Sequence, residues 1–238
     1  QAYTNFKNKI LIQKDLANTL KIIASKGKKG FYEGEIAEKI SSEMKKNDGL
    51  ISKSDLKKYN PVWREPLISD YKDTKIITMG PPSSGGLHVI QMLNILDNFN
   101  LKKIKHNSSE YINLLAETMK YAYADRSKYL GDPDFYNVPV KKVTSKKYAN
   151  EISNNIEIGK AASVEDIYPG KFIENESHET THFSVVDKNG NVVSMTYTLN
   201  STFGSKVVIK GTGILMNNEM DDFSAAPGIP NQFNLLGA

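Results

Sequence analysis

The chain contains no cysteine among its 238 residues. This absence excludes disulfide bonds, thiolate metal sites and a cysteine nucleophile. No apolar run approaches the ~20 residues that a membrane-spanning helix needs. With 39% hydrophobic and 24% charged residues, the composition is that of an ordinary globular protein. A chain of this length can bury a core as one large domain or as two small ones.

Arginine is also scarce, because Arg64 and Arg126 are the only two. The other basic residues are lysines scattered among acids, so the net charge of +4 does not indicate nucleic-acid binding. The chain has four histidines, at positions 88, 106, 178 and 182. Even His178 and His182, four residues apart, fall across a predicted loop-to-strand junction, and none of the four shows metal-ligand spacing. We therefore expect no metal ion.

Residues 180–187 alternate in the way that is typical of a half-buried strand. The pattern places His182, Ser184 and Val186 on one face, and residues 183, 185 and 187 on the other. Asn189-Gly190 follows, a pair that supplies positive φ for a tight turn, and residues 192–199 return as a second strand. From the pattern alone, this region is predicted to be a β-hairpin.

The chain before this hairpin is predicted to be mainly helical. Apolar spacing predicts helices over 10–26, 31–46, 87–99, 108–130 and 145–155, a short capped helix after Ser52, and strands over 67–71 and 75–79. The string 80–86, Gly-Pro-Pro-Ser-Ser-Gly-Gly, lacks the ending of a phosphate-binding loop, so we interpret it as a turn in which Ser83 or Ser84 caps the next helix. Asp125 and Arg126 are expected to pair with charges on other elements. Residues 156–178 have the composition of an exposed connector.

Several longer strings occur at fixed spacing from residue 180 onward. They are Thr180-Thr181-His182, Ser184-Val185-Val186-Asp187, Thr196-Tyr197-Thr198-Leu199-Asn200, Thr202-Phe203-Gly204 and the run Asn217-Asn218-Glu219-Met220-Asp221-Asp222-Phe223-Ser224. Together they resemble the start of the small subunit of γ-glutamyltransferases (γ-glutamyltranspeptidases). The strings at 50–56 and 81–86 resemble the large subunit of the same family, whose members are made as one precursor that cuts itself before a threonine.

The resemblance implies an α+β fold, the αββα sandwich of N-terminal-nucleophile hydrolases, with strands from His182 onward in the central sandwich. It also implies that residues 1–179 are the later part of a large subunit and residues 180–238 the early part of a small, catalytic subunit. The family's oxyanion glycines and serine pair lie beyond Ala238, and its carboxylate-binding arginine lies upstream of Gln1. The chain therefore resembles a central, partial portion of a longer enzyme and is expected to be inactive by itself.

The resemblance assigns the catalytic roles. The cut falls between Glu179 and Thr180, and Thr180 becomes an N-terminal nucleophile whose own α-amine is the base. Thr181 is the rival nucleophile, but strand alternation places it on the opposite face from Thr180. Thr198 matches the family's second threonine, which hydrogen-bonds the nucleophile.

Substrate recognition is assigned in the same way. Asn200, Glu219 and Asp222 match positions that bind the α-amino group of the glutamyl moiety, and an ammonium does need acceptors with negative charge. The implied function is transfer of a γ-glutamyl group from glutathione or another γ-glutamyl compound to an amino acid, a dipeptide or water, without a cofactor. The two subunits would stay associated after cleavage, in a periplasmic or secreted enzyme.

Two other functions remain open. The first is a related acylase of the same fold, of the cephalosporin or glutaryl type, although Glu219 and Asp222 favour a substrate with an α-amino group. The second is a non-catalytic homologue or fragment, for which an intact Glu179–Thr180 bond would be the sign.

Overall fold

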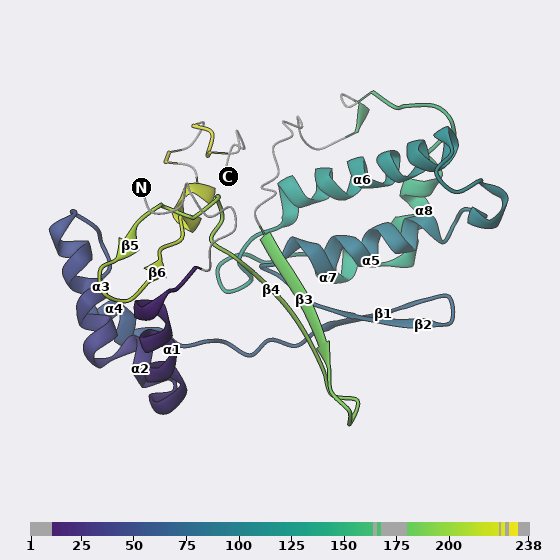
Figure 1. Cartoon of the computed structure of the whole chain (residues 1–238). Coiled ribbons are helices and arrows are strands. Elements are labelled where there is room, and N and C mark those ends of the chain that lie inside the picture. Colours follow the sequence, from purple (N-terminus) through teal and green to yellow (C-terminus); the bar gives the residue numbers. More distant parts are fainter. Residues whose placement is uncertain (1–10, 164–165, 168–179, 224, 227–228, 233–238) are drawn as a thin grey trace. The chain divides into compact units, whose positions relative to one another are not determined.

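The computed structural model describes residues 11–163, 166–167, 180–223, 225–226 and 229–232. The chain divides into two compact units (Figure 1). Unit 1 combines Gln1–Pro61 with Ile173–Ala238, and unit 2 is the continuous segment Val62–Phe172. Unit 1 is therefore assembled from the two ends of the chain, with unit 2 inserted between them in the sequence.

Unit 1 holds four helices and four strands among the described residues. They are α1 (Lys14–Lys26), α2 (Lys28–Tyr32), α3 (Gly34–Lys46), α4 (Lys53–Lys58), β3 (Thr180–Val186), β4 (Val192–Thr198), β5 (Val208–Ile209) and β6 (Ile214–Leu215), followed by the 3₁₀ helix η3 (Glu219–Asp222). β3 pairs antiparallel with β4, and β5 with β6. The core of the unit lies between α3 and β5, where Ile36, Ile40 and Ile209 are buried together.

The helices of unit 1 differ from the predicted ones at their ends. The predicted helix 10–26 is observed from Lys14, and the predicted helix 31–46 is interrupted, because Glu33 is extended and Gly34 has a φ of 66°. The capping box of α4 is confirmed: Ser52 Oγ accepts from the Asp55 backbone N–H, and Asp55 Oδ2 accepts from the Ser52 N–H at 2.9 Å.

Unit 2 contains one β-hairpin and a group of helices. Its elements are β1 (Leu67–Tyr71), β2 (Thr74–Thr78), α5 (Ser84–Leu96), the 3₁₀ helix η1 (Leu101–Lys103), α6 (Ser109–Tyr129), α7 (Val140–Val143) and α8 (Lys146–Ser153). Side chains of α5, α6 and α8 form the main buried cluster, including Ile95, Leu114 and Ile152. No helix in the described part of the chain is long and apolar enough to cross a membrane.

The predicted strands and long helix of unit 2 are confirmed, and two details are wrong. Ser108 caps α6 by accepting from the Tyr111 N–H at 3.2 Å, as expected. Ser83 is the N-cap residue of α5, but its side chain makes no capping hydrogen bond, and Ser84 already lies within the helix. Helix α7 was not predicted.

The second wrong detail concerns Asp125, which was expected to form an ion pair. Asp125 is instead buried, and its hydrogen-bond partners are neutral side chains. Its side chain is 2% exposed. Its carboxylate accepts from Gln91 Nε2 at 2.5 Å and from the Tyr148 hydroxyl at 2.9 Å. Burial raises the pKa of Asp125 above its usual value, and these two hydrogen bonds oppose that shift. The carboxylate thus joins α5, α6 and α8 through hydrogen bonds.

Candidate active site

The register of the β3–β4 hairpin brings the two predicted catalytic threonines to opposite positions. Thr180 is the cross-strand partner of Thr198, and Thr181 is the partner of Tyr197. Directly opposed residues of an antiparallel pair belong to the same face of the sheet. Thr180 and Thr198 therefore share one face of the hairpin, and Thr181 belongs to the other face, as the alternation predicted.

On the face that carries Thr180, the polar side chains of His182, Ser194 and Thr196 are joined across the strands. His182 Nδ1 lies 2.7 Å from Thr196 Oγ1, and His182 Nε2 lies 3.2 Å from Ser194 Oγ. A hydroxyl can either donate to a ring nitrogen or accept from it, so both contacts can be hydrogen bonds. His182 is thus engaged on both nitrogens and links the two strands.

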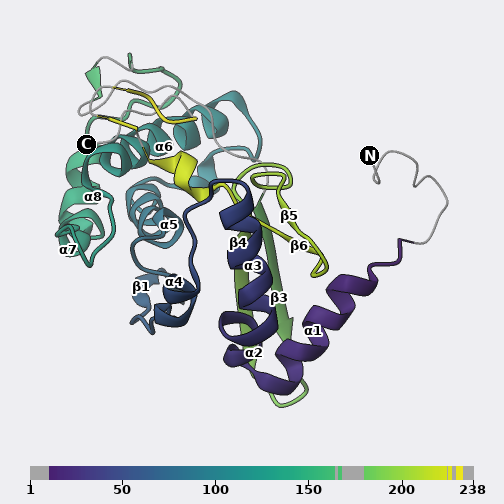
Figure 2. The same ribbon diagram turned by 90° about the vertical axis from the view of Figure 1, so that its left-hand side faces the viewer.

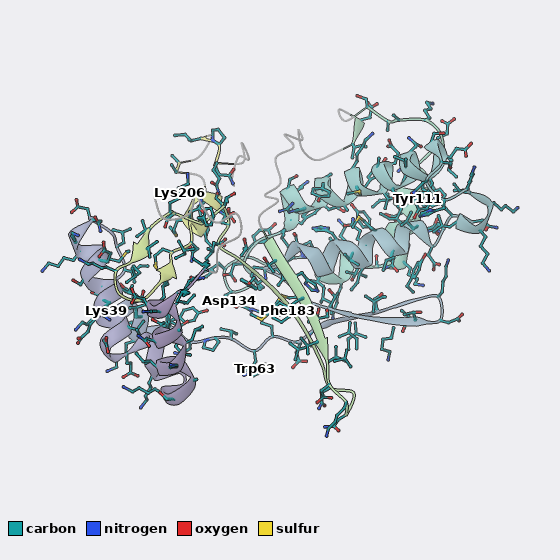
Figure 3. All side chains as sticks on the ribbon, in the orientation of Figure 1. Lys39, Trp63, Tyr111, Asp134, Phe183 and Lys206 are labelled. Carbon is teal, nitrogen blue, oxygen red and sulfur yellow. The ribbon has the colours of Figure 1, made fainter. Side chains whose placement is uncertain are left out.

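The opposite face of the hairpin is apolar. Phe183 and Tyr197 contact each other edge to face at 6.4 Å, and their side chains are 41% and 52% exposed (Figure 3 labels Phe183). Val185, Val193 and Met195 continue this surface and are also exposed. The predicted division of the strand into two faces is therefore confirmed, and within this chain both faces are open to solvent.

The turn of the hairpin is wider than the predicted Asn-Gly turn. Gly190 has a φ of 82°, whereas Asn189 is not among the described residues with positive φ. Asp187 Oδ1 accepts from the backbone N–H groups of Asn189 and Asn191, at 2.8 and 2.9 Å. The turn is therefore stabilised by hydrogen bonds from its backbone to the Asp187 side chain. The predicted turn would have required positive φ at both Asn189 and Gly190.

Three of the predicted site residues are joined by hydrogen bonds just after β4. Thr198 Oγ1 accepts from the Asn200 backbone N–H at 2.9 Å, and Asn200 Nδ2 donates to Asp222 Oδ1 at 2.8 Å. The Asn200 side chain is 4% exposed, and its φ is 75°, a left-handed conformation that asparagine tolerates better than most residues. A buried amide thus connects the end of the β3–β4 hairpin to the acidic turn.

Glu219 begins the acidic turn η3, and Asp222 ends it. Burial of Glu219, and secondarily the neighbouring charge of Asp222, raise the pKa of the Glu219 carboxyl. Two neighbouring carboxylates that repel each other are stabilised when a cation binds beside them. The turn is therefore suited to an ammonium group.

Sequence reasoning gave no individual role to Asn218, which hydrogen-bonds both the segment after β4 and the acidic turn. Its backbone N–H donates to the Leu199 carbonyl at 3.1 Å, and its Oδ1 accepts from the Ser201 N–H at 2.9 Å. Its Nδ2 donates to Asp221 Oδ2 at 2.9 Å. The signal available was an asparagine just before an acidic run, a residue type whose side chain often hydrogen-bonds nearby backbone.

The cleavage site is only partly described. Glu179 lies outside the described residues, and Thr180 is described through its backbone pairing with Thr198. The residues that the structure brings together are thus Thr198, Asn200 and Asp222, with Glu219 in the same turn.

Comparisons with known proteins identify the family of the chain. A model of the γ-glutamyltranspeptidase family matches residues 4–238. The "Glutathione hydrolase proenzyme" of Escherichia coli (strain K12) is 52% identical over 231 residues, which is 97% of this chain and 40% of that protein. The crystal structure of Helicobacter pylori γ-glutamyltranspeptidase matches 68% of this chain and 46% of its own, with 48% identity and a TM-score of 0.66. That of the cephalosporin acylase from Bacillus halodurans matches 96% and 39%, with 29% identity and a TM-score of 0.75.

These likenesses define the fold as a portion of the α+β N-terminal-nucleophile hydrolase architecture, as expected. The chain belongs to the γ-glutamyltranspeptidase family. It spans about 40% of the length of the curated relatives that it matches.

Proposed function

We propose that this chain is part of a self-processing enzyme that transfers the γ-glutamyl group of glutathione and similar compounds. The acceptor is an amino acid, a dipeptide or water, and the nucleophile is Thr180. One observation carries the proposal: the hydrogen bonds from Thr198 through Asn200 to Asp222 start opposite Thr180 in the hairpin. The names of the relatives, which are glutathione hydrolase proenzymes, support the same reaction class and a precursor that is processed.

A threonine hydroxyl needs a base at neutral pH, and the proposed base is the α-amine of Thr180. That amine becomes free only when the bond before Thr180 is cut, so self-cleavage is the first reaction. Thr180 Oγ attacks the carbonyl carbon of Glu179, the peptide C–N bond breaks as an ester forms, and the hydroxyl proton passes to the Thr180 nitrogen, which becomes a free amine. Water then hydrolyses the ester and leaves Glu179 with a carboxylate. The products are residues 1–179 and a polypeptide that begins with Thr180.

Group transfer is the second reaction and uses the same oxygen. The free α-amine of Thr180 takes the hydroxyl proton while Oγ attacks the γ-carbonyl carbon of the donor. The leaving amine takes that proton as its C–N bond breaks, and a γ-glutamyl ester of Thr180 remains. Water or the amine of an acceptor then attacks the ester carbon and restores the Thr180 hydroxyl.

In this proposal Thr198 orients the nucleophile. Its Oγ1 already accepts from the Asn200 backbone N–H at 2.9 Å. A hydroxyl that accepts one hydrogen bond is polarised and becomes a stronger donor. Its proton is therefore well suited to stabilise negative charge that develops on Thr180 Oγ.

The α-amino group of the donor binds at the acidic turn. Asn200 fixes one carboxylate oxygen of Asp222, so that carboxylate can accept from an ammonium without further loss of side-chain freedom. Glu219 supplies a second negative charge in the same turn. A related acylase of the cephalosporin or glutaryl type is the second candidate function, supported by the likeness to a cephalosporin acylase over 96% of the chain. A glutaryl substrate has no α-amino group, so the acidic turn favours the γ-glutamyl reaction over hydrolysis of such a substrate.

Mass spectrometry and N-terminal sequencing of the full-length protein test self-cleavage. Thr180→Ala should remain one polypeptide, whereas the wild type should give two, the second beginning with Thr180. Thr181→Ala is the matched control and should still be cut, because Thr181 lies on the other face of the hairpin. A new N-terminus at Thr181 or elsewhere contradicts the assignment. Cell fractionation would test the proposed periplasmic or secreted location.

A further inference from the structure

The turn between β5 and β6, residues Lys210–Gly213, joins two parts of unit 1 that the proposed cut would separate. β5 and β6 follow Thr180 in the sequence, whereas α1 and α3 precede it. Ile209 of β5 is fully buried against Ile36 and Ile40 of α3. In Figures 1 and 2 the turn lies beside α1 and α3. The hydrophobic core of unit 1 is therefore shared between the two proposed subunits.

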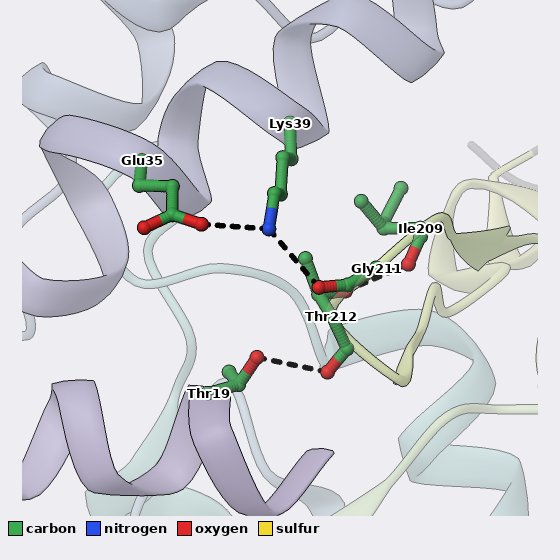
Figure 4. Close-up of polar contacts among 6 residues, drawn as sticks. All are labelled: Thr19, Glu35, Lys39, Ile209, Gly211 and Thr212. Carbon is green, nitrogen blue, oxygen red and sulfur yellow. Dashed lines mark hydrogen bonds and ion pairs between the residues drawn. The ribbon is translucent and has the colours of Figure 1, made fainter. Parts of the chain in front are cut away.

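Polar contacts hold the same turn on both helices (Figure 4). Thr19 Oγ1 of α1 donates to the Thr212 carbonyl at 2.8 Å, and both residues are buried. Lys39 Nζ of α3 donates to the Gly211 carbonyl at 3.1 Å and forms an ion pair with Glu35 at 2.7 Å. A buried carbonyl that loses its donor leaves an unsatisfied group, so the Thr19 contact is costly to break.

Gly213 allows the turn to approach α1 closely. Its φ is 68°, and a Cβ built there would lie 2.8 Å from both the backbone nitrogen and the Cβ of Leu16. Gly211 has a similar φ of 71°, but its Cβ would meet only the end of the Lys39 side chain, at 3.6 Å. Both glycines thus have a positive φ, which favours glycine. Of the two, only Gly213 lies so close to α1 that an added Cβ would clash with helix backbone.

We propose that the Lys210–Gly213 turn is the latch that retains the polypeptide beginning at Thr180 on the N-terminal polypeptide after the chain is cut. The partner surface is the pair of helices α1 and α3. This inference rests on the proposed function, because it assumes a cut before Thr180. Once that bond is broken, the two halves of unit 1 are connected through non-covalent contacts. The latch contributes a buried hydrogen bond and a hydrogen bond from a charged lysine, next to the shared core at Ile209.

The latch can be tested without self-cleavage. A recognition sequence for an added protease is inserted between Ser177 and His178 of the full-length protein, in a Thr180→Ala background, with an affinity tag at the C-terminus. After proteolysis, the N-terminal polypeptide that stays on the affinity resin is measured over time. If the wild-type protein fails to cut itself, the proposed function is contradicted. The latch measurement still stands, because it uses an added protease and a Thr180→Ala variant.

The parent protein should retain its N-terminal polypeptide after proteolysis. Gly213→Ala should release it, and Gly211→Ala should retain it as the parent does, which separates the clash with α1 from backbone strain. Thr19→Val keeps the shape of the side chain and removes its hydrogen bond to Thr212, so dissociation should be about 5- to about 150-fold faster. Unchanged dissociation in Thr19→Val, or equal release in Gly211→Ala and Gly213→Ala, would overturn the proposal.

Discussion

Replacing Asp222 with alanine tests how the site recognises its substrate. In the structure, Asp222 Oδ1 accepts from Asn200 Nδ2 at 2.8 Å, and the Asp222 side chain is exposed. The amide of Asn200 is buried, but its Nδ2 also donates to the Asn218 carbonyl at 3.2 Å and keeps that partner when Asp222 is removed, so Asp222→Ala should fold and cut itself normally. A hydrogen bond to a charged group contributes about 1.5–3 kcal/mol, which corresponds to an about 10- to about 150-fold lower kcat/KM for a γ-glutamyl donor.

The assay compares two substrates that differ only in the α-amino group. Asp222→Ala in the full-length enzyme should lose activity on γ-glutamyl-p-nitroanilide and keep its activity on glutaryl-p-nitroanilide, which has no ammonium to bind. Asp221→Ala is the matched control, since it removes the same charge from the same 3₁₀ helix, and the Asp221 carboxylate is hydrogen-bonded to Asn218.

Equal losses on both substrates would refute the reasoning, because the effect would then not depend on the α-amino group. Equal losses in Asp221→Ala and Asp222→Ala on the γ-glutamyl substrate would refute it too. In that case net charge, and not the position fixed by Asn200, would determine binding. Loss of self-cleavage in Asp222→Ala would assign the residue a structural role.

Two further predictions concern titration. Because burial and the Asp222 charge raise the pKa of Glu219, the KM for γ-glutamyl donors should rise as pH falls through that pKa, and Glu219→Gln should abolish this dependence in a pH–KM profile. Tyr148→Phe removes a donor to Asp125, so the free energy of unfolding at neutral pH should fall by about 1–3 kcal/mol. Burial raises the pKa of Asp125, and this loss should shrink as pH falls below that pKa and the carboxyl becomes neutral; urea unfolding at several pH values would show a constant loss if the reasoning is wrong.

The local pattern predicted the hairpin well, because side-chain direction in a strand follows from a period of two. The cross-strand contact between His182 and Thr196 is a direct result of that period. The pattern did not predict the interruption at Glu33 and Gly34, because the apolar spacing continues across these two residues. The partners of Asp125 could not be predicted either, because Gln91 and Tyr148 lie 34 and 23 residues away in the sequence.

The roles at the site came from resemblance and not from residue type. Glu219 and Asp222, taken alone, would be interpreted as solvated residues of an acidic turn. What distinguishes Asp222 is its contact with the buried amide of Asn200, which is 22 residues away. The left-handed φ of Asn200 and the central position of Asn218 likewise depend on how β4 and the acidic turn meet, which no local pattern encodes.

The composition of unit 1 from both ends of the chain has a consequence for biosynthesis. Thr19 and Thr212, which form a buried hydrogen bond, are 193 residues apart in the sequence. At a translation rate of about 5–20 residues per second, the ribosome needs roughly 10–40 s to make the intervening segment. During that time part of the apolar surface of helices α1 and α3 is uncovered, whereas unit 2 is a continuous segment that does not depend on the last part of the chain. In the proposed self-cleavage, the uncut chain keeps the late segment tethered to α1 and α3, so cleavage should follow the contact between Thr19 and Thr212.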